Sequence, residues 1–362
     1  MNRSVLITII VAVLLIGAGG AYVLLSSDDD GENKTYDVRV GYLAGDLHQV
    51  ARVVASDDDV NGGESLFKEN GLNISTPFAA GYANGGSVMD AFAADDIDIG
   101  FLGSPPAILK SLNLKIDIII VAMVNSEGSS VVVKDGIDNF TDLKGKTIAT
   151  PGVSSIQHLF LLELAAANGM NVKLDGTDGD DDTVFYVQVA PKDMQAAMDT
   201  NQVQAAIAWE PYGSQMILSG AGELLLWSGD VWPDHPCCVI AVSRSFAETN
   251  PDTVEMFLKA FIQANEMIDG AFDAGSGETY DRIITLATEF SGTNETVVLS
   301  SMEHMDLDYQ IGDNFETYLE DYTQSYIDLG LIPGSKLADR DYANVTEYVE
   351  DLVQVQYLEA VD

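Results

Sequence analysis

From Tyr36 onward, short β-rich runs alternate with helical stretches, and this alternation limits the chain to α/β architectures. In the first series, strand candidates occupy residues 38–43, 74–78, 97–102 and 116–124, with helix candidates at 66–70, 88–93 and 106–112. Pro106 lies in the first helical turn, where its missing N–H costs nothing. The pattern predicts βαβ units in a largely parallel sheet.

A second series begins near Ser129, with strand candidates at 130–133, 147–149, 184–189, 204–208 and 224–227 and a long helix at 156–168. A return strand follows at 238–242, and after it we expect only helices, at 253–271, 280–289, 315–329 and 342–355. The 362 residues also exceed what one core usually organises. We therefore predict two lobes, residues 36–125 with 239–362 and residues 126–238, joined by a double hinge crossing near 125–128 and 236–239.

The N-terminal residues 1–35 predict a membrane anchor or a signal segment, followed by a linker. Residues 5–25 are uncharged and almost wholly apolar, which is long enough to cross a bilayer as a helix. Arg3 precedes them and Asp28 to Asp30 follow, an order that places the body outside the cell. We expect the extracellular face of the membrane, with an uncleaved anchor favoured over secretion through a cleaved signal peptide.

The charge of the chain excludes some partners. Lys and Arg total 17 against 57 Asp and Glu, giving a formal charge of -40 that repels nucleic acid. Residues 57–59 and 178–182 indicate solvated acidic loops, with a cation-binding loop as the alternative. Cys237 and Cys238 are too close in sequence for an unstrained disulfide, and we expect small buried side chains rather than a soft-metal site with His235. We expect no metal and no cofactor.

Loops rich in Gly, Ser or Thr follow strand candidates at residues 43–48, 81–87, 103–106 and 150–155. Each precedes a helix, whose first N–H groups and dipole favour an anion. N-capping alone is the alternative explanation for Ser87 and Ser154. Because the loops divide into two pairs across the proposed hinge, we expect them to converge on one cleft between the lobes. Walker, Gly-x-Ser-x-Gly and spaced metal-ligand motifs are missing from the sequence, so we expect no enzyme activity.

Several stretches resemble the solute-binding proteins of the nitrate, sulfonate, taurine and bicarbonate group of ABC importers. They are Gly41-Tyr42-Leu43, Gly85-Gly86-Ser87, Asp98-Ile99-Gly100, Gly103-Ser104-Pro105-Pro106, Asp142-Leu143-Lys144-Gly145-Lys146-Thr147-Ile148-Ala149, Pro191-Lys192-Asp193-Met194 and Ala208-Trp209-Glu210-Pro211-Tyr212. The resemblance implies a type II periplasmic-binding-protein fold, a small solute, an ABC permease as partner and a monomer. The alternative is binding or synthesis of a thiamine-pyrimidine precursor on the same fold.

The resemblance implies ligand contacts at the end of the first strand, in the Gly-Gly-Ser loop, in the Thr150 loop and along the Trp209 segment. Trp209 offers a flat face, with packing inside the second lobe as the alternative, and Glu210 can orient a donor. His48 and His235 can donate to an anion, whereas His158 fits the apolar pattern of its helix. The complete predicted ligand site is Leu43, His48, Gly85, Gly86, Ser87, Gly103, Ser104, Pro105, Ser129, Thr150, Ser154, Ser155, Trp209, Glu210 and His235.

Overall fold

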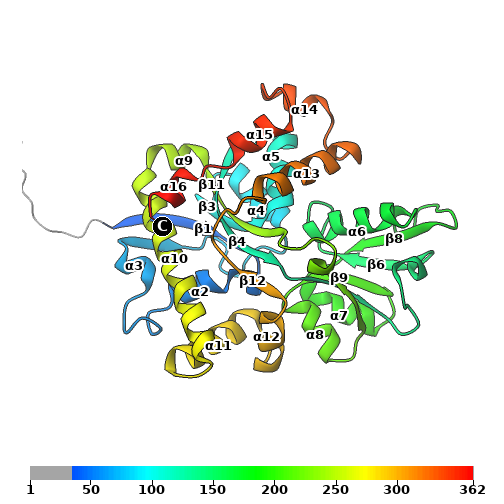
Figure 1. Ribbon diagram of the computed structural model, residues 1–362, viewed down its shortest axis with the longest axis horizontal. Helices are drawn as coiled ribbons and strands as arrows, with labels where there is room; N and C mark the ends of the chain where they lie inside the picture. Colours follow the sequence, from blue (N-terminus) through cyan, green and yellow to red (C-terminus); the bar gives the residue numbers. More distant parts are fainter. Residues whose placement is uncertain (1–34, 362) are drawn as a thin grey trace, which may run out of the picture. The chain divides into compact units, whose positions relative to one another are not determined.

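Two six-stranded sheets form the framework of the computed structural model, which describes residues 35–361, all within one compact unit. The strand order is β12-β4-β11-β3-β1-β2 in the first sheet and β10-β5-β9-β6-β8-β7 in the second (Figure 1). The strands are β1 (Tyr36–Gly41), β2 (Leu72–Ser75), β3 (Ile99–Gly103), β4 (Ile118–Glu127), β5 (Ser129–Val133), β6 (Thr147–Thr150), β7 (Asn171–Leu174), β8 (Thr183–Gln188), β9 (Ala205–Trp209), β10 (Glu223–Trp227), β11 (Pro236–Ser243) and β12 (Met305–Leu307). The predicted two-sheet α/β fold class is confirmed.

The chain crosses between the two sheets twice. Strand β4 of the first sheet leads through Gly128 directly into β5 of the second, and β10 returns to β11 of the first. Strand β11 runs antiparallel to both β3 and β4, so the first sheet is mixed and the expectation of a largely parallel sheet is wrong there. Strands β4 and β11 carry the chain between the sheets in opposite directions and lie side by side, so they pair antiparallel. The lobe boundaries given above stay a prediction.

Helices and short 3-10 turns connect the strands. They are η1 (Leu47–Gln49), α2 (Val50–Ser56), α3 (Leu66–Glu69), α4 (Gly85–Ala93), α5 (Ser104–Leu114), η2 (Phe140–Leu143), α6 (Ile156–Ala167), α7 (Pro191–Asp199), α8 (Tyr212–Leu218), η3 (Ser228–Asp230), α9 (Arg244–Thr249), α10 (Pro251–Ala274), α11 (Glu278–Ser291), α12 (Glu295–Met302), α13 (Phe315–Asp328), α14 (Ser335–Ala338), α15 (Val345–Leu352) and α16 (Gln356–Glu359). Helix α5 begins beside two prolines, and α10 begins at a proline, as expected from their fixed φ.

The second sheet shows how strand periodicity builds two cores. Val131 and Val133 of β5 join the apolar cluster that includes Phe160 of α6. Val132 joins the opposite cluster, which includes Met194 of α7. Successive strand side chains point to opposite faces, so one strand fills both layers. Figure 1 shows α6 on one face of this sheet and α7 and α8 on the other.

Three sequence-based expectations are corrected. The region after β11 is not purely helical, because β12 pairs antiparallel with the end of β4. Strand β7 was not expected, and β2 lies at 72–75 rather than at 74–78. The predicted anchor or signal and linker at residues 1–35 lies outside the described residues, apart from Thr35. Within residues 35–361, no helix is both long enough and apolar enough to cross a membrane.

Candidate functional site

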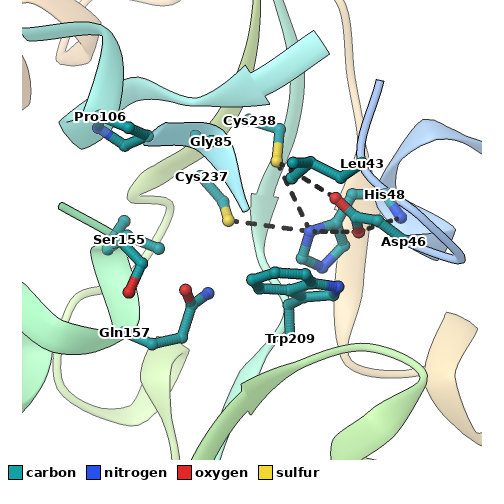
Figure 2. A pocket seen from close by; sticks show the side chains of 12 residues that line it. Leu43, Asp46, His48, Gly85, Pro106, Ser155, Gln157, Trp209, Cys237 and Cys238 are labelled. Atoms are coloured by element: carbon teal, nitrogen blue, oxygen red, sulfur yellow. Dashed lines mark hydrogen bonds and ion pairs between the residues drawn. The ribbon is translucent and has the colours of Figure 1, made fainter. Parts of the chain in front are cut away.

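A small cavity with an empty volume of about 280 Å³, partly open to solvent, lies where strand ends and helix starts of both sheets meet (Figure 2). Its lining residues are Leu43, Asp46, His48, Gly85, Gly103, Pro106, Ser155, Ile156, Gln157, Trp209, Cys237 and Cys238. In Figure 2, Ser155 and Gln157 lie on one side of the cavity and Asp46 and His48 on the other.

Three helices begin at this cavity. Gly85 starts α4, Gly103 is the N-cap of α5, and Ser155 is the N-cap of α6, with its hydroxyl accepting from the backbone N–H of His158. Helix starts carry unpaired N–H groups and the positive end of the dipole, so their convergence favours an anion. The two prolines that follow Ser104 have no N–H to donate, which leaves α4 and α6 as the main donors.

The observed helix caps contradict the alternative that N-capping explains Ser87 and Ser154. Asn84, not Ser87, caps α4, and its Oδ1 accepts from the backbone N–H of Ser87 at 3.0 Å. Ser155, not Ser154, caps α6. N-capping therefore does not explain Ser87 or Ser154.

Two glycines allow these helix starts to approach one another. A Cβ on Gly85 would lie 2.5 Å from Cγ of Pro106, and a Cβ on Gly86 would lie 2.9 Å from Oγ of Ser154. Real Cβ atoms do not come this close to a neighbour. A side chain at position 85 would push against the rigid ring of Pro106 and move α4, whereas at position 86 the hydroxyl of Ser154 would have to rotate away. The Gly-Gly pair thus shapes the cavity by close packing as much as by backbone donors.

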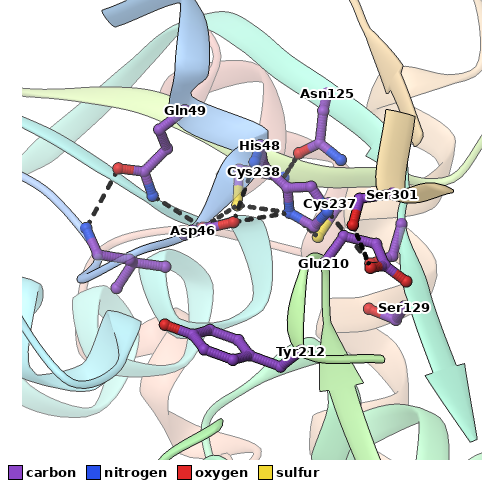
Figure 3. A network of polar contacts seen from close by, with 12 residues as sticks. Asp46, His48, Gln49, Asn125, Ser129, Glu210, Tyr212, Cys237, Cys238 and Ser301 are labelled. Atoms are coloured by element: carbon purple, nitrogen blue, oxygen red, sulfur yellow. Dashed lines mark hydrogen bonds and ion pairs between the residues drawn. The ribbon is translucent and has the colours of Figure 1, made fainter. Parts of the chain in front are cut away.

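A buried polar network surrounds His48 (Figure 3). Its Nε2 lies 3.1 Å from the carbonyl oxygen of Gly128, and its Nδ1 lies 3.3 Å from Oδ1 of Asp46. Asp46 is held in turn by Nε2 of Gln49, which donates to Oδ2 at 2.9 Å. The sulfur of Cys237 lies 3.7 Å from Nδ1 of His48, and that of Cys238 lies 3.8 Å away. The network joins the loop after β1 to the segment that crosses into the second sheet.

Burial and charge shift the pKa values of this network. Burial works to lower the pKa of His48, but the negative groups Asp46 and Cys237 outweigh it and raise that pKa to about 9. Burial raises the pKa of Asp46 against the pull of His48. A hydrogen bond from Cys238 and the charge of His48 lower the pKa of Cys237 against the effect of burial. At neutral pH the imidazolium therefore faces negative groups, and His48 is largely neutralised before a ligand arrives.

Trp209 and Glu210 lie at the end of β9, but only Trp209 lines the cavity. The Trp209 ring also packs edge-on against Tyr212 within the core of the second sheet, as the packing alternative expected, and its contact with a ligand stays a prediction. Glu210 is fully buried behind it, where Oε2 accepts from the backbone N–H of Ser214 at 3.2 Å and from Oγ of Ser301 at 2.8 Å. Burial raises the pKa of Glu210. Its place suits a residue that fixes the wall rather than one that contacts a ligand.

The structure brings six of the predicted site residues together around the cavity: Leu43, His48, Gly85, Gly103, Ser155 and Trp209. The remaining predicted residues do not line it: Gly86, Ser87, Ser104, Pro105, Ser129, Thr150, Ser154, Glu210 and His235. Some of these support the wall instead: Oγ of Ser129 accepts from Gln157, and Oγ1 of Thr150 contacts Nδ1 of His158. His235 is buried, which lowers its pKa, and its Nδ1 contacts the carbonyl oxygen of Trp232.

Sequence reasoning missed six lining residues: Asp46, Pro106, Ile156, Gln157, Cys237 and Cys238. Asp46 and Pro106 lie inside loops that the sequence singled out, so loop position was the available signal. The cysteines are buried, as expected, and neither forms a disulfide, but both thiols contact polar groups rather than only apolar ones.

A larger and more open hollow of about 990 Å³ lies elsewhere on the chain. Five aspartates line it: Asp234, Asp269, Asp306, Asp308 and Asp313. Burial and the neighbouring carboxylates raise the pKa of Asp269, which reports mutual repulsion of negative charge. This hollow disfavours an anion, so size alone does not identify the ligand site.

Comparison with known proteins identifies a family and several relatives with similar sequences. The sequence profile of the NMT1-like family matches residues 31–282. The taurine-binding periplasmic protein of Escherichia coli is 30% identical over 188 residues, which are 51% of this chain and 55% of that relative. The chain thus spans little more than half the length of this curated relative.

Solved structures share the fold. The alkanesulfonate-binding protein SsuA from Xanthomonas axonopodis, bound to MOPS, has a TM-score of 0.69 at 20% identity, covering 89% of this chain and 99% of that one. The periplasmic nitrate-binding protein NrtA from Synechocystis also has a TM-score of 0.69, at 16% identity, covering 90% of this chain and 88% of that one. At these identities the likeness concerns the fold.

Proposed function

This chain belongs to the NMT1-like family, and from that premise we propose that it is the extracytoplasmic substrate-binding component of an ABC importer. Its solute would be a small anion of the nitrate, sulfonate, taurine or bicarbonate class, held in the cavity at His48 and Trp209. The observation that carries this proposal is the convergence of three helix starts on one small cavity. Such a site binds without covalent chemistry, so no catalytic residue is required.

The two lobes, residues 36–125 with 239–362 and residues 126–238, would close on the solute by bending at the two crossing segments. Contacts that span the two sheets support closure: Oη of Tyr212 donates to the carbonyl of Ala44 at 3.1 Å, and Oη of Tyr326 donates to that of Ser154 at 3.3 Å. A ligand that touches both lobes lowers the free energy of the closed state and leaves that of the open state nearly unchanged. This difference in free energy drives closure. The closed monomer would then be recognised by a membrane permease, with residues 1–35 as the tether.

Calorimetric titration of the full chain in mild detergent, against nitrate, taurine, alkanesulfonates and bicarbonate, tests this function. We expect one member of the panel to bind with a stoichiometry of one. Trp209→Ala should weaken that binding about tenfold, because a lost contact of about 1.4 kcal/mol corresponds to that factor. Trp209→Phe keeps an aromatic wall and should retain most of the affinity.

Trp227→Ala is the matched control, because Trp227 stacks on His304 and does not line the cavity. Its affinity should equal that of the unmodified protein. If the folded protein binds none of these anions, the proposed solute class is wrong. If a thiamine-pyrimidine precursor binds instead, the anion is the wrong solute, and the alternative function on this fold is favoured. The curated relative above is named as a taurine-binding protein, and taurine carries a sulfonate group, which favours the anion over the pyrimidine.

A further inference from the structure

We propose that Nδ1 of His48 and the sulfur atoms of Cys237 and Cys238 bind a thiophilic metal ion, Zn²⁺, in the wall of the cavity. These three potential ligand atoms lie within 4.8 Å of one another, and all three residues are buried. Tetrahedral zinc, with Zn–N near 2.0–2.1 Å and Zn–S near 2.3 Å, separates nitrogen and sulfur ligands by about 3.6 Å. The observed separations from Nδ1 are 3.7 Å to Cys237 and 3.8 Å to Cys238. The site therefore needs little rearrangement to close on the ion.

An irregularity in β11 explains how adjacent cysteines reach one ion. In a regular strand, successive side chains point to opposite faces. The pairing of β11 with β4 shifts register between Pro236 and Cys238 and again between Cys238 and Val239. A bulge of this kind re-aims a side chain. Figure 2 shows both sulfur atoms directed toward the imidazole of His48.

The second nitrogen of His48 is already arranged for metal binding. A carbonyl oxygen can only accept, so the 3.1 Å contact between Nε2 and the Gly128 oxygen places a proton on Nε2. A metal ion would displace the second proton of the imidazolium from Nδ1, and the Nδ1 lone pair would then face the ion beside the two sulfur atoms. A metal-binding histidine commonly donates its other N–H to a backbone carbonyl, which fixes the ring in this way.

The carboxylate next to the three ligand atoms favours a cation, although the helix starts elsewhere on the cavity wall favour an anion. Oδ1 of Asp46 lies 3.3 Å from Nδ1 of His48, and Oδ2 lies 3.7 Å from the sulfur of Cys238. Among the described residues, no lysine or arginine lines the cavity. Three protein ligands leave the fourth tetrahedral position to Asp46 or to a molecule in the cavity. Two thiolates and one imidazole select zinc over calcium or magnesium, which prefer oxygen.

The test is titration of the metal-free full chain, in detergent and a phosphine reductant, with Co²⁺ and then with Zn²⁺. We expect one Co²⁺ per chain with a thiolate-to-cobalt charge-transfer absorption, which stoichiometric Zn²⁺ removes. The absorption is essential, because a surface with a formal charge of -40 also binds cations weakly through oxygen. No solute is added, so the result is independent of the proposed transport function.

Cys237→Ser and Cys238→Ser should each reduce the charge-transfer absorption. His48→Gln should weaken Zn²⁺ binding at least roughly 10–100-fold, because even the loss of a residue that only supports a metal ligand has an effect of this size. His304→Gln is the matched control, because His304 stacks on Trp227 and does not line the cavity. It should bind both metals as the unmodified chain does. Circular dichroism confirms that each variant is folded. The proposal is overturned if the folded, reduced chain shows two reactive thiols but no thiolate–cobalt absorption, or if the cysteine variants retain that absorption unchanged.

Discussion

Gly128 holds two contacts of the segment that crosses between the two sheets. Its φ is 77°, and its carbonyl oxygen faces both Nε2 of His48 and the backbone N–H of Glu210. A Cβ at this position would lie 2.2 Å from Nε2 of His48. Gly128 is thus required twice, by its backbone conformation and by the close approach of the imidazole.

Replacement Gly128→Ala should therefore lower the free energy of unfolding by about 1–3 kcal/mol through left-handed strain, plus the cost of displacing His48. Gly145→Ala is a matched control, since Gly145 has a φ of 71° but no atom near its missing Cβ. Both variants should lose stability through backbone strain, and Gly128→Ala should lose more because it also displaces His48. Comparing their urea denaturation separates the two effects. Equal losses in the two variants would contradict the role assigned to His48.

The residues of the site were partly predictable. A glycine-rich or serine-rich loop before a helix is visible in sequence, which is why Gly85, Gly103 and Ser155 were expected at the cavity that they line. Cys237 and Cys238 were not, because their placement depends on a register shift in β11. A shift of this kind depends on the partner strand, and no local pattern encodes it.

Helix α6 is the element that ties the second sheet to the cavity. Ser155 begins it at the cavity wall, and His158 is buried one turn later, with Nδ1 3.1 Å from Oγ1 of Thr150. The ring of His158 also packs edge-on against Tyr186 of β8. As the sequence suggested, this histidine packs in the helix core, and burial lowers its pKa to about 4.

That depressed pKa predicts acid sensitivity. The unfolded chain binds a proton at His158 near its ordinary pKa of 6.5, whereas the folded chain does so only near 4. The stability contributed by the neutral ring is therefore fully present above pH 6.5 and is lost as the pH falls toward 4, by up to about 3 kcal/mol. Carboxylates titrate in the same window, so a pH profile of the unmodified protein does not isolate His158.

His158→Gln supplies the reference, because glutamine keeps a polar side chain without a proton equilibrium. Urea denaturation at pH 7 and pH 4.5 should show the stability difference between the two proteins shrinking or reversing at the lower pH. A difference that stays constant between these pH values would show that the His158 pKa is not depressed.

At the scale of elements, strands that are short, continuously buried runs were predicted within one to three residues, β5 and β9 among them. Strand β12 was missed because three residues give too little periodicity, and β7 was missed because only two of its four residues are apolar. Strand β12 exists by pairing with the end of β4, a long-range contact of residues 305–307 with 125–127. Tertiary pairing, not local propensity, decides such elements.

For the whole molecule, the property that composition reveals most clearly is negative charge. The basic side chains that form ion pairs in the described residues include Arg39 with Asp98, Arg244 with Asp351 and Arg282 with Asp57. Since 17 basic residues face 57 acidic ones, most carboxylates have no cationic partner. Exposed ion pairs contribute only about 0–1 kcal/mol each, whereas the excess negative charge repels throughout the folded chain.

Adding KCl should therefore stabilise the protein, because screening weakens repulsion more than it weakens the few ion pairs. We expect a gain of roughly 1–3 kcal/mol between low salt and about 1 M, where the Debye length falls to about 3 Å. Thermal unfolding across a KCl series measures it. Sucrose is the control, because it stabilises by exclusion from the protein surface and does not screen charge. The stabilisation by sucrose should grow steadily with concentration, whereas that by KCl should level off once the Debye length is shorter than the spacing between charges. A loss of stability with KCl would mean that the ion pairs, and not the unpaired carboxylates, govern the electrostatics of this fold.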